Sequence, residues 1–221
     1  MGTLTVMGVD GWRGGWIGAR MTGTEITWEL LADASAVCAS QADAIAVDIP
    51  IGLPTGARRR CDVEASRLLR PGGSSRVFPT PPRAVLAAVD YLDACALSFA
   101  DCGKKLSKQT WGIWPKIRDF ELTPRDDDRV VEAHPEVSFL RLSGRILSSK
   151  HHPAGLAERM AVLGEHFDVP RALTAVPKGV GLDDALDALA CAWTAARWAW
   201  KEAEVLGGEV DALGVPMRIV V

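Results

Sequence analysis

The chain has 221 residues, is 48% hydrophobic and carries a formal net charge of −3. This length suits one α/β domain with room for an insertion, and the charge does not indicate a surface that is basic throughout. The five cysteines form no C-x-x-C pair, which argues against a disulfide framework or a zinc site and favours a reducing cytoplasm. No signal peptide and no bilayer-length apolar segment is visible, so we expect no membrane association.

The first fifty residues predict a small mixed sheet. We expect strands over residues 3–10, 16–21, 25–31 and 44–49, and a helix over 32–41. The first three strands are joined by short Gly-containing turns and should be antiparallel, whereas the helix before the fourth makes that strand parallel to a neighbour. If the neighbour is the first strand, Asp10 and Asp48 lie side by side.

Residues 52–120 are rich in Pro and Gly between short helical stretches, and we expect them to form a mostly helical insertion within one domain that covers residues 1–221. Further along the chain we expect a strand at 129–133, helices at 137–142 and 154–167, a long helix at 183–206 and a last strand at 215–221.

Carboxylates stand at the ends of several of these elements. Asp10, Asp48 and Glu132 end or sit within apolar strands, and Asp184 and Asp187 share one face of an apolar helix. Unpaired buried charges are costly, but a divalent cation such as Mg²⁺ neutralises converging carboxylates. The pattern therefore suggests a metal site on a sheet, of the kind that cleaves phosphodiesters with two ions about 4 Å apart.

Each carboxylate also has an ordinary structural explanation. Asp10 precedes a glycine, and Asp-Gly is favoured in hairpin turns. Asp48 could bond a loop amide at a strand end, and Asp184 could complement the dipole of the helix. Asp187 is harder to explain in this way, because it lies inside the apolar helix. By strand periodicity, Glu132 shares a face with His134, a candidate ligand or proton shuttle.

Residues 55–118 contain twelve basic and five acidic residues, an excess of seven positive charges in an acidic chain. Arginine forks suit phosphate oxygens, so we expect Arg58, Arg59 and Arg60 to be exposed and to track phosphates. Lys150 lies in a second, smaller basic segment. A solvated surface is the alternative explanation. The phosphate-loop, G-x-S-x-G, H-E-x-x-H and G-x-G-x-x-G motifs are missing from the sequence.

The assembled motifs resemble those of the family called domain of unknown function 429, regarded as predicted nucleases with an RNase H-like fold. The matching segments are Gly8-Val9-Asp10-Gly11, 47–54, Arg60-Cys61-Asp62, 75–79, 109–111, 132–139 and 183–188. The last segment is also similar to the acidic helix of Holliday-junction resolvases. By that likeness, Asp10, Asp48, Asp184 and Asp187 are metal ligands, and Glu132 belongs to the family's own pattern.

The resulting prediction is an α/β protein with an RNase H-like mixed sheet, strands 1–3 antiparallel and 4–5 parallel, that hydrolyses DNA or RNA with Mg²⁺ or Mn²⁺. Asp10 would bridge two metal ions. Asp48 and Asp187 would complete the coordination of one ion, and Asp184 or Glu132 that of the other. Two alternatives stay open. One is a binding module that kept the fold without catalysis. The other is a nucleotide-binding phosphotransferase of the actin and sugar-kinase type, which is less favoured because such proteins bind between two domains.

Overall fold

A computed structural model describes residues 3–221 of the chain. The chain forms two compact units, and each is described by itself. Unit 1 comprises the residues up to Ile49, Arg125–Glu204 and Val220–Val221, and unit 2 comprises Pro50–Pro124 and Val205–Ile219. None of the helices within residues 3–221 combines the length and the apolar character that a bilayer crossing requires.

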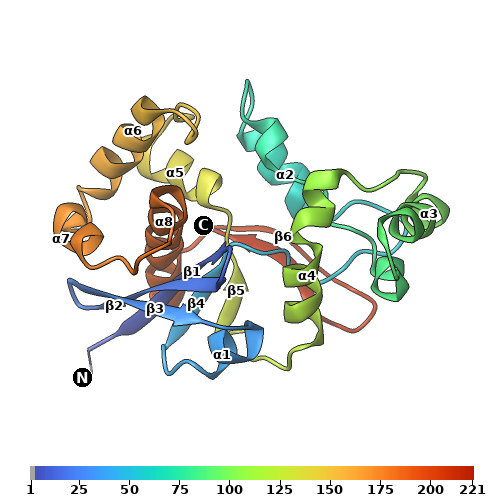
Figure 1. The fold of residues 1–221 in the computed structure, drawn as a ribbon, viewed down its shortest axis with the longest axis horizontal. Helices are drawn as coiled ribbons and strands as arrows, with labels where there is room; N and C mark the ends of the chain where they lie inside the picture. The colour runs from blue at the N-terminus through green and yellow to red at the C-terminus, as the bar shows by residue number, and fades with distance from the viewer. Residues whose placement is uncertain (1–2) are drawn as a thin grey trace. The chain divides into compact units, whose positions relative to one another are not determined.

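Unit 1 is built on a mixed sheet in which five strands of the described residues follow the order β3-β2-β1-β4-β5 (Figure 1). The strands are β1 (Thr5–Trp12), β2 (Gly15–Thr22), β3 (Glu25–Leu31), β4 (Ala44–Val47) and β5 (Val130–Glu132). Strands β1, β2 and β3 pair antiparallel, whereas β4 is parallel to both β1 and β5. This confirms the predicted mixed sheet and the predicted pairing of the first and fourth strands.

The burial of each strand follows its place in the sheet. The central strand β4 is buried along its whole length, while the edge strand β3 has several exposed residues, as expected for strands covered on both faces or on one. Gly23 has φ +59° in the turn between β2 and β3, a left-handed conformation that glycine adopts without strain.

Five helices among the described residues complete unit 1. They are α1 (Ala34–Ala39), α5 (Pro135–Ser143), α6 (Pro153–Leu163), α7 (Val169–Thr174) and α8 (Leu182–Ala199). Figure 1 shows α8 lying along one face of the sheet, where it packs on β1, β4 and β2, with α5 and α6 against it. The helix expected to reach residue 206 ends at Ala199, and α7 was not predicted.

Gly8 allows α8 to approach β1 closely. A Cβ atom on Gly8 would lie 1.9 Å from the backbone nitrogen of Ala192 and 2.1 Å from the carbonyl oxygen of Ala188, which is impossible without moving the helix. The alanine-rich face of α8 meets the apolar side chains of β1, β2 and β4 in the core of unit 1. The contact fixes the height of α8 above the strand that carries Asp10.

Unit 2 is largely helical and also contains a two-stranded sheet. Its helices are α2 (Arg60–Leu68), α3 (Tyr91–Cys102), α4 (Lys108–Leu122) and two 3₁₀ helices (Ser74–Arg76 and Arg83–Ala87), and its strands are β6 (Val205–Val210) and β7 (Pro216–Val220). Helix α2 packs on β6. Buried Asp211 forms an ion pair with Arg83 and accepts a bond from the amide of Leu53, which ties three distant segments together.

Candidate functional site

Asp10 and Asp48 come together because β1 and β4 are parallel and in register. Val9 pairs with Val47, and the amide of Asp48 donates to the carbonyl of Val9 at 2.9 Å. The two aspartates each follow one of these partners, so both side chains point to the same face of the sheet. Gly8, two residues before Asp10, contacts α8, which identifies this face as the one that the helix covers.

Helix α8 adds two carboxylates to this face. Asp187 is 2% exposed, and its Oδ1 atom has no hydrogen-bond partner in the structure. Asp184 lies one turn earlier, in the first turn of α8, and is partly buried. The charge of Asp187 and that of Asp184 both act on Asp10. The structure therefore brings together the four aspartates that the sequence predicted as metal ligands.

The pKa values of these carboxyls are raised by their surroundings. Burial raises the pKa of Asp10 well above its usual value, and repulsion from Asp48, Asp187 and Asp184 adds to the effect. Burial likewise raises the pKa of Asp48 to about 6 and that of Asp187 to about 6, although the positive charge of Lys150 opposes both shifts. The cluster therefore carries more negative charge than its environment accommodates.

Lys150 supplies a positive charge inside the cluster. Its Nζ atom lies 2.5 Å from Oδ2 of Asp187, and its side chain is 29% exposed. Burial lowers the pKa of Lys150, but Asp187, Asp10 and Asp48 outweigh burial and raise that pKa above its usual value. The sequence predicted Lys150 as a substrate-binding residue, whereas in the structure it binds one of the predicted metal ligands.

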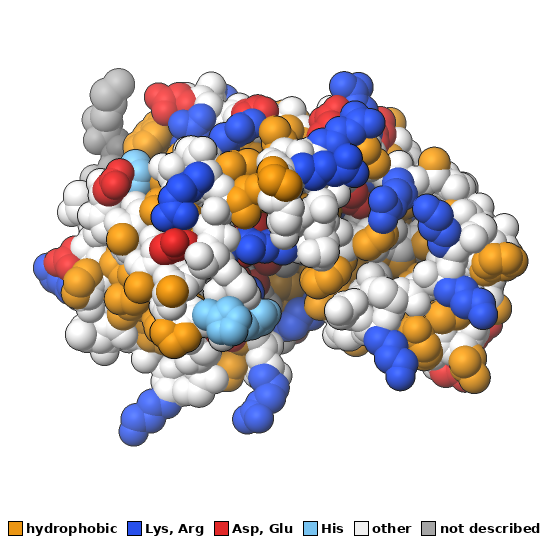
Figure 2. All heavy atoms as spheres, turned by 90° about the horizontal axis from the view of Figure 1, so that it is seen from above, with side chains coloured by type: hydrophobic (Ala, Val, Ile, Leu, Met, Phe, Trp, Pro, Cys, Tyr) orange, Lys and Arg blue, Asp and Glu red, His pale blue; other side chains and the backbone are white. Residues whose placement is uncertain are grey.

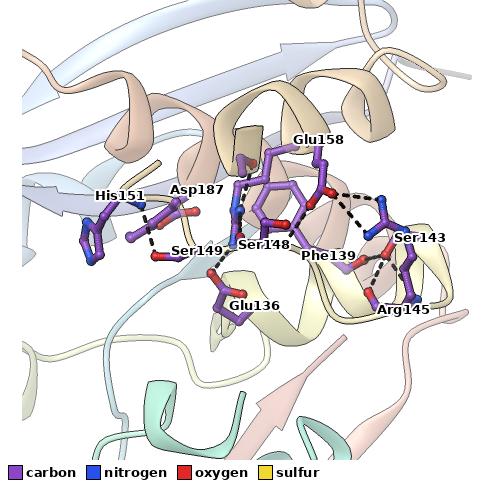
Figure 3. A network of polar contacts seen from close by, with 12 residues as sticks. Glu136, Phe139, Ser143, Arg145, Ser148, Ser149, His151, Glu158 and Asp187 are labelled. Carbon is purple, nitrogen blue, oxygen red and sulfur yellow. Dashed lines mark hydrogen bonds and ion pairs between the residues drawn. The ribbon is translucent and has the colours of Figure 1, made fainter. Parts of the chain in front are cut away.

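The loop that carries Lys150 is anchored by buried polar contacts. Fully buried Arg159 on α6 donates to the carbonyl oxygens of Ser148 and Gly155, and its ion pair with Glu136 on α5 measures 2.5 Å. Figure 3 shows Asp187 beside this network, which includes Glu136, Ser148 and Ser149. The negative charge of Glu136 raises the pKa of both Asp48 and Asp187.

Sequence reasoning missed Arg159, and it interpreted Glu136 only as a residue that caps the helix after Pro135. Glu136 stands in the first turn of α5, directly after Pro135, and the same motif contains Glu132 and His134. The sequence feature that indicates Glu136 is Pro135, which precedes it and starts a helix. Glu136 therefore lies close to the end of β5, at the start of α5. No local signal indicates the role of Arg159, because Glu136 and Ser148, which it joins, lie 23 and 11 residues away from it.

The structure does not bring Glu132 into the cluster. Glu132 pairs with Val47 in the parallel ladder, so its side chain shares the face of Val47 and not that of Asp48. Because successive residues of a strand point to opposite faces, the side chain of Glu132 lies on the face of the sheet that α8 does not cover.

The three arginines predicted to bind phosphate differ from one another. Arg58 is exposed. Arg60 is also exposed and forms an ion pair with Glu64 on the next turn of α2. Arg59 is only 1% exposed and bonds Asp62 and the carbonyl of Ile51, so the expectation that it lies in an exposed loop was wrong. Figure 2 shows basic side chains scattered over the face in view, several of them beside acidic ones.

The chemistry of the cluster suits a hard divalent cation. Carboxylate oxygens are the ligands of Mg²⁺ and Mn²⁺, and the unbonded Oδ1 of buried Asp187 is available as one of them. Within residues 3–221, however, no group of three or more His, Cys, Asp or Glu side chains already has a metal-holding arrangement. Lys150 binds Asp187 instead, so a metal ion would have to displace its ammonium group.

The fold and the site define an α/β protein with an acidic cluster between a mixed sheet and a covering helix. A family model described as "Protein of unknown function (DUF429)" matches residues 8–212. The chain belongs to this family, and the resemblance drawn from its motifs is confirmed. No curated protein and no solved structure matches the chain.

Proposed function

We propose that this protein is a divalent-metal-dependent phosphodiesterase with an RNase H-like fold that acts on nucleic acid in the cytoplasm. Asp10, Asp48 and Asp187 would hold Mg²⁺ or Mn²⁺, with Asp184 as a further ligand. The observed strand order and the position of α8 agree with the fold that the family resemblance implies. Because fold alone does not define a reaction, the proposal depends on the site.

The observation that supports the proposal is the convergence of Asp10, Asp48 and Asp187 from β1, the end of β4 and α8. Each has a raised pKa, and burial is the largest cause in all three. Like charges at buried positions destabilise a protein unless a cation neutralises them. A cluster of this kind is therefore more easily explained by a function than by stability.

The residues of the chain have separate roles in this proposal. A bound metal ion would supply a Lewis acid that activates water and stabilises the leaving oxygen. Asp10 and Asp48 present their oxygens from adjacent rigid strands, and Gly8 keeps Asp187 at a fixed height above them. Once released from Asp187, the ammonium group of Lys150 is free to contact a substrate phosphate.

The test compares Asp48→Asn with Asp183→Asn in a Mn²⁺-dependent cleavage assay on fluorescent single-stranded and duplex DNA and RNA. Asp183 is a matched control, because it is a partly buried aspartate in the first turn of α8 that does not act on the cluster. We expect Asp48→Asn to abolish cleavage, with a loss of at least about 10²-fold, while Asp183→Asn retains it.

Two outcomes would contradict the nuclease proposal. If the wild type binds Mn²⁺ and cleaves none of these substrates, the protein is better described as a binding module with an inactive site. If both variants lose activity equally, the effect comes from the helix and not from the cluster. Unfolding of Asp48→Asn in EDTA distinguishes a functional loss from a folding defect, because removal of one crowded charge should not destabilise the metal-free protein.

A further inference from the structure

Unit 2 contains a cavity of about 290 Å³ that the acidic cluster does not use. Its apolar surface comes mainly from Pro54, Pro79, Pro81, Pro82 and Leu106. Rigid proline rings form a preshaped apolar wall, and binding pockets of small molecules are typically apolar with a few polar groups. The volume lies at the lower end of the usual range of roughly 300–1,000 Å³, which suits a ligand of the size of one nucleotide.

The charged side chains around this cavity are all positive. Arg58, Lys104 and Lys105 line it, and no Asp or Glu does. All three are exposed, and none of them forms an ion pair within residues 3–221. Other arginines of unit 2 are already paired with acids, as Arg59 is with Asp62 and Arg83 with Asp211. The charged lining of the first cavity is therefore positive, which favours an anionic ligand.

Two further features of the cavity can donate hydrogen bonds to an anion. Thr80 lines the cavity, is 8% exposed, and its Oγ1 atom has no hydrogen-bond partner in the structure. Helix α4, which has 15 residues, starts at the cavity, where Ser107 caps it by accepting a bond from the amide of Thr110 at 3.0 Å. The free amides in the first turn of a helix attract phosphate groups.

A second, more polar cavity of about 370 Å³ adjoins the first. Both are lined by Arg58, Pro79 and Ser107, and the second cavity adds Ser66, Ser74, Ser75 and Gln109. Asp62 also lines the second cavity, and its carboxylate is paired with Arg59. Arg58 and Ser107 line both cavities, whereas Lys104, Lys105 and Thr80 line only the apolar one. A nucleotide combines the groups that these linings suit, because its sugar, which carries hydroxyl groups, joins an apolar planar base to a phosphate.

We propose that unit 2 binds a nucleotide in these two cavities. The base would lie against the proline wall, and the phosphate would bind Arg58, Lys104, Lys105 and the first turn of α4. The sugar would face the serine-lined cavity. The same chemistry is offered by a free mononucleotide and by one nucleotide of a nucleic-acid strand, and the size of the apolar cavity favours the mononucleotide. This site does not depend on the nuclease proposal, because its residues are separate from the acidic cluster.

The test is isothermal titration of the whole protein in EDTA at low salt, so that the acidic cluster holds no metal. The probes are adenosine monophosphate, uridine monophosphate, adenosine and inorganic phosphate. We expect the two mononucleotides to bind at least about tenfold more tightly than adenosine or inorganic phosphate. Adenosine lacks the contacts of the phosphate, and inorganic phosphate lacks those of the base and the sugar. The double variant Lys104→Gln/Lys105→Gln should weaken mononucleotide binding by at least about tenfold.

Arg118→Gln is the control, because Arg118 is an exposed basic residue of unit 2 that lies far from the first turn of α4 and lines neither cavity. It should leave the affinity within about twofold. Thr80→Val tests the unpartnered hydroxyl without a change in volume and should weaken binding while leaving the melting temperature unchanged. Circular dichroism of each variant checks that it is folded.

Three results would overturn this proposal. In the first, inorganic phosphate binds as tightly as the mononucleotides, which would reduce the site to an anion patch. In the second, affinity is the same in the Lys104/Lys105 and Arg118 variants. In the third, only a short oligonucleotide binds and a mononucleotide does not compete with it, which would mean that the lysines follow a polymer backbone. Loss of metal-dependent cleavage has no bearing on any of these measurements, so the two proposals fail separately.

Discussion

At the scale of single residues, Lys150 governs the electrostatics of the acidic cluster. Its ammonium group bonds Asp187 at 2.5 Å and acts on Asp10 and Asp48 as well. A divalent ion and this ammonium group would compete for the same oxygens, because both are attracted by the same excess of negative charge. A metal ion that binds the cluster must therefore displace the ammonium group of Lys150.

Replacement of Lys150 by methionine should strengthen metal binding and weaken the metal-free fold. Without the ammonium group the carboxylates repel one another more, so the free energy of unfolding in EDTA should fall at pH 8 and change less at pH 5, where more carboxyls are protonated. The Kd for Mn²⁺ should fall by roughly tenfold. Calorimetry and urea unfolding measure the two effects.

Lys178→Met serves as the control for Lys150→Met, since Lys178 is an exposed lysine of unit 1 outside the cluster. It should change neither quantity. Equal or weaker Mn²⁺ binding by Lys150→Met would mean that Lys150 helps to assemble the site and does not compete with the metal.

The pH dependence of stability should show the raised pKa values of Asp48 and Asp187, both about 6. Between about pH 4 and 6 the folded protein holds protons on these groups that the unfolded chain has lost, so their contribution to stability falls as pH rises. Glu64, Glu158 and Asp211 have lowered pKa values and act in the opposite direction. A comparison with a variant is therefore needed.

Asp48→Asn isolates this contribution. Relative to wild type in EDTA, the variant should gain on the order of 1–2 kcal/mol as pH rises from 4 to 7, because only the wild type must ionise a buried carboxyl. Urea unfolding at four pH values gives the difference directly. A constant or declining difference would show that Asp48 is instead a structural hydrogen-bond acceptor.

The sequence predicted the four aspartates of the cluster because each ends, begins or lies within an apolar element. It could not predict the partner of Lys150, which lies 37 residues from Asp187, since a loop gives no periodicity from which to infer contacts. The placement of Glu132 required the register of β5 against β4, and the burial of Arg59 required the position of Ile51, whose carbonyl accepts a bond from Arg59. Both depend on tertiary structure.

At the scale of elements, the contact between β1 and α8 determines the geometry of the cluster. Gly8→Ala would place a methyl group 1.9 Å from a backbone atom of α8, so the helix must move or the core must open. We expect a loss of roughly 3 kcal/mol or more in unfolding free energy, at or above the usual range for overpacking. Metal binding should weaken at the same time, because Asp187 moves with the helix.

Gly112→Ala is the matching control in α4, because a Cβ atom there meets nothing within 4 Å. It should stabilise the protein by up to about 1 kcal/mol through helix propensity. Thermal and urea unfolding of both variants make the comparison. If Gly8→Ala is as stable as wild type and binds Mn²⁺ equally well, the helix does not set the height of Asp187.

Sequence patterns predicted most elements of unit 1 but not where α8 ends. The chain leaves the helix at Lys201, which has φ +62° although helix ends of this kind usually carry glycine. Strand β6 was not predicted, because two adjacent glycines interrupt its sequence. Gly207 and Gly208 lie in its middle with φ +76° and +111°, and a glycine pair normally indicates a loop.

At the scale of the whole molecule, metal binding should appear as a gain in thermal stability. A ligand that binds only the folded protein adds roughly 2.7 kcal/mol at 100 times its Kd, which corresponds to a shift of about 5 °C or more for a chain of this size. Melting curves with EDTA, Mg²⁺ and Mn²⁺ provide the measurement. The absence of a shift at millimolar metal would count against a metal site, and a shift that persists in Asp10→Asn would place the metal elsewhere.

The sheet was the most predictable part of the whole molecule. Its turns carry glycine, its strands are apolar, and the single helix between β3 and β4 requires a parallel return. Unit 2 was less predictable, because the sequence placed a helical insertion at 52–120 but gave no sign that β6 and β7 also belong to that unit. Those strands join it through contacts such as that of Asp211 with Arg83, which no local pattern reveals.

The chain passes from one unit to the other four times, after Ile49, Pro124, Glu204 and Ile219, and this has a practical consequence for dissecting the protein. No single truncation yields either unit, because each unit is built from separate segments of the chain. Cleavage at one site would therefore not separate the two units. The second segment of unit 2, residues 205–219, is nevertheless easy to remove. The amide of Glu204 donates to the carbonyl of Val221 at 2.8 Å, and the amide of Val221 donates back at 2.9 Å, so the ends of unit 1 already meet there. A short engineered turn in place of residues 205–219 would join them without new strain, which makes this replacement the natural first step towards an isolated unit 1.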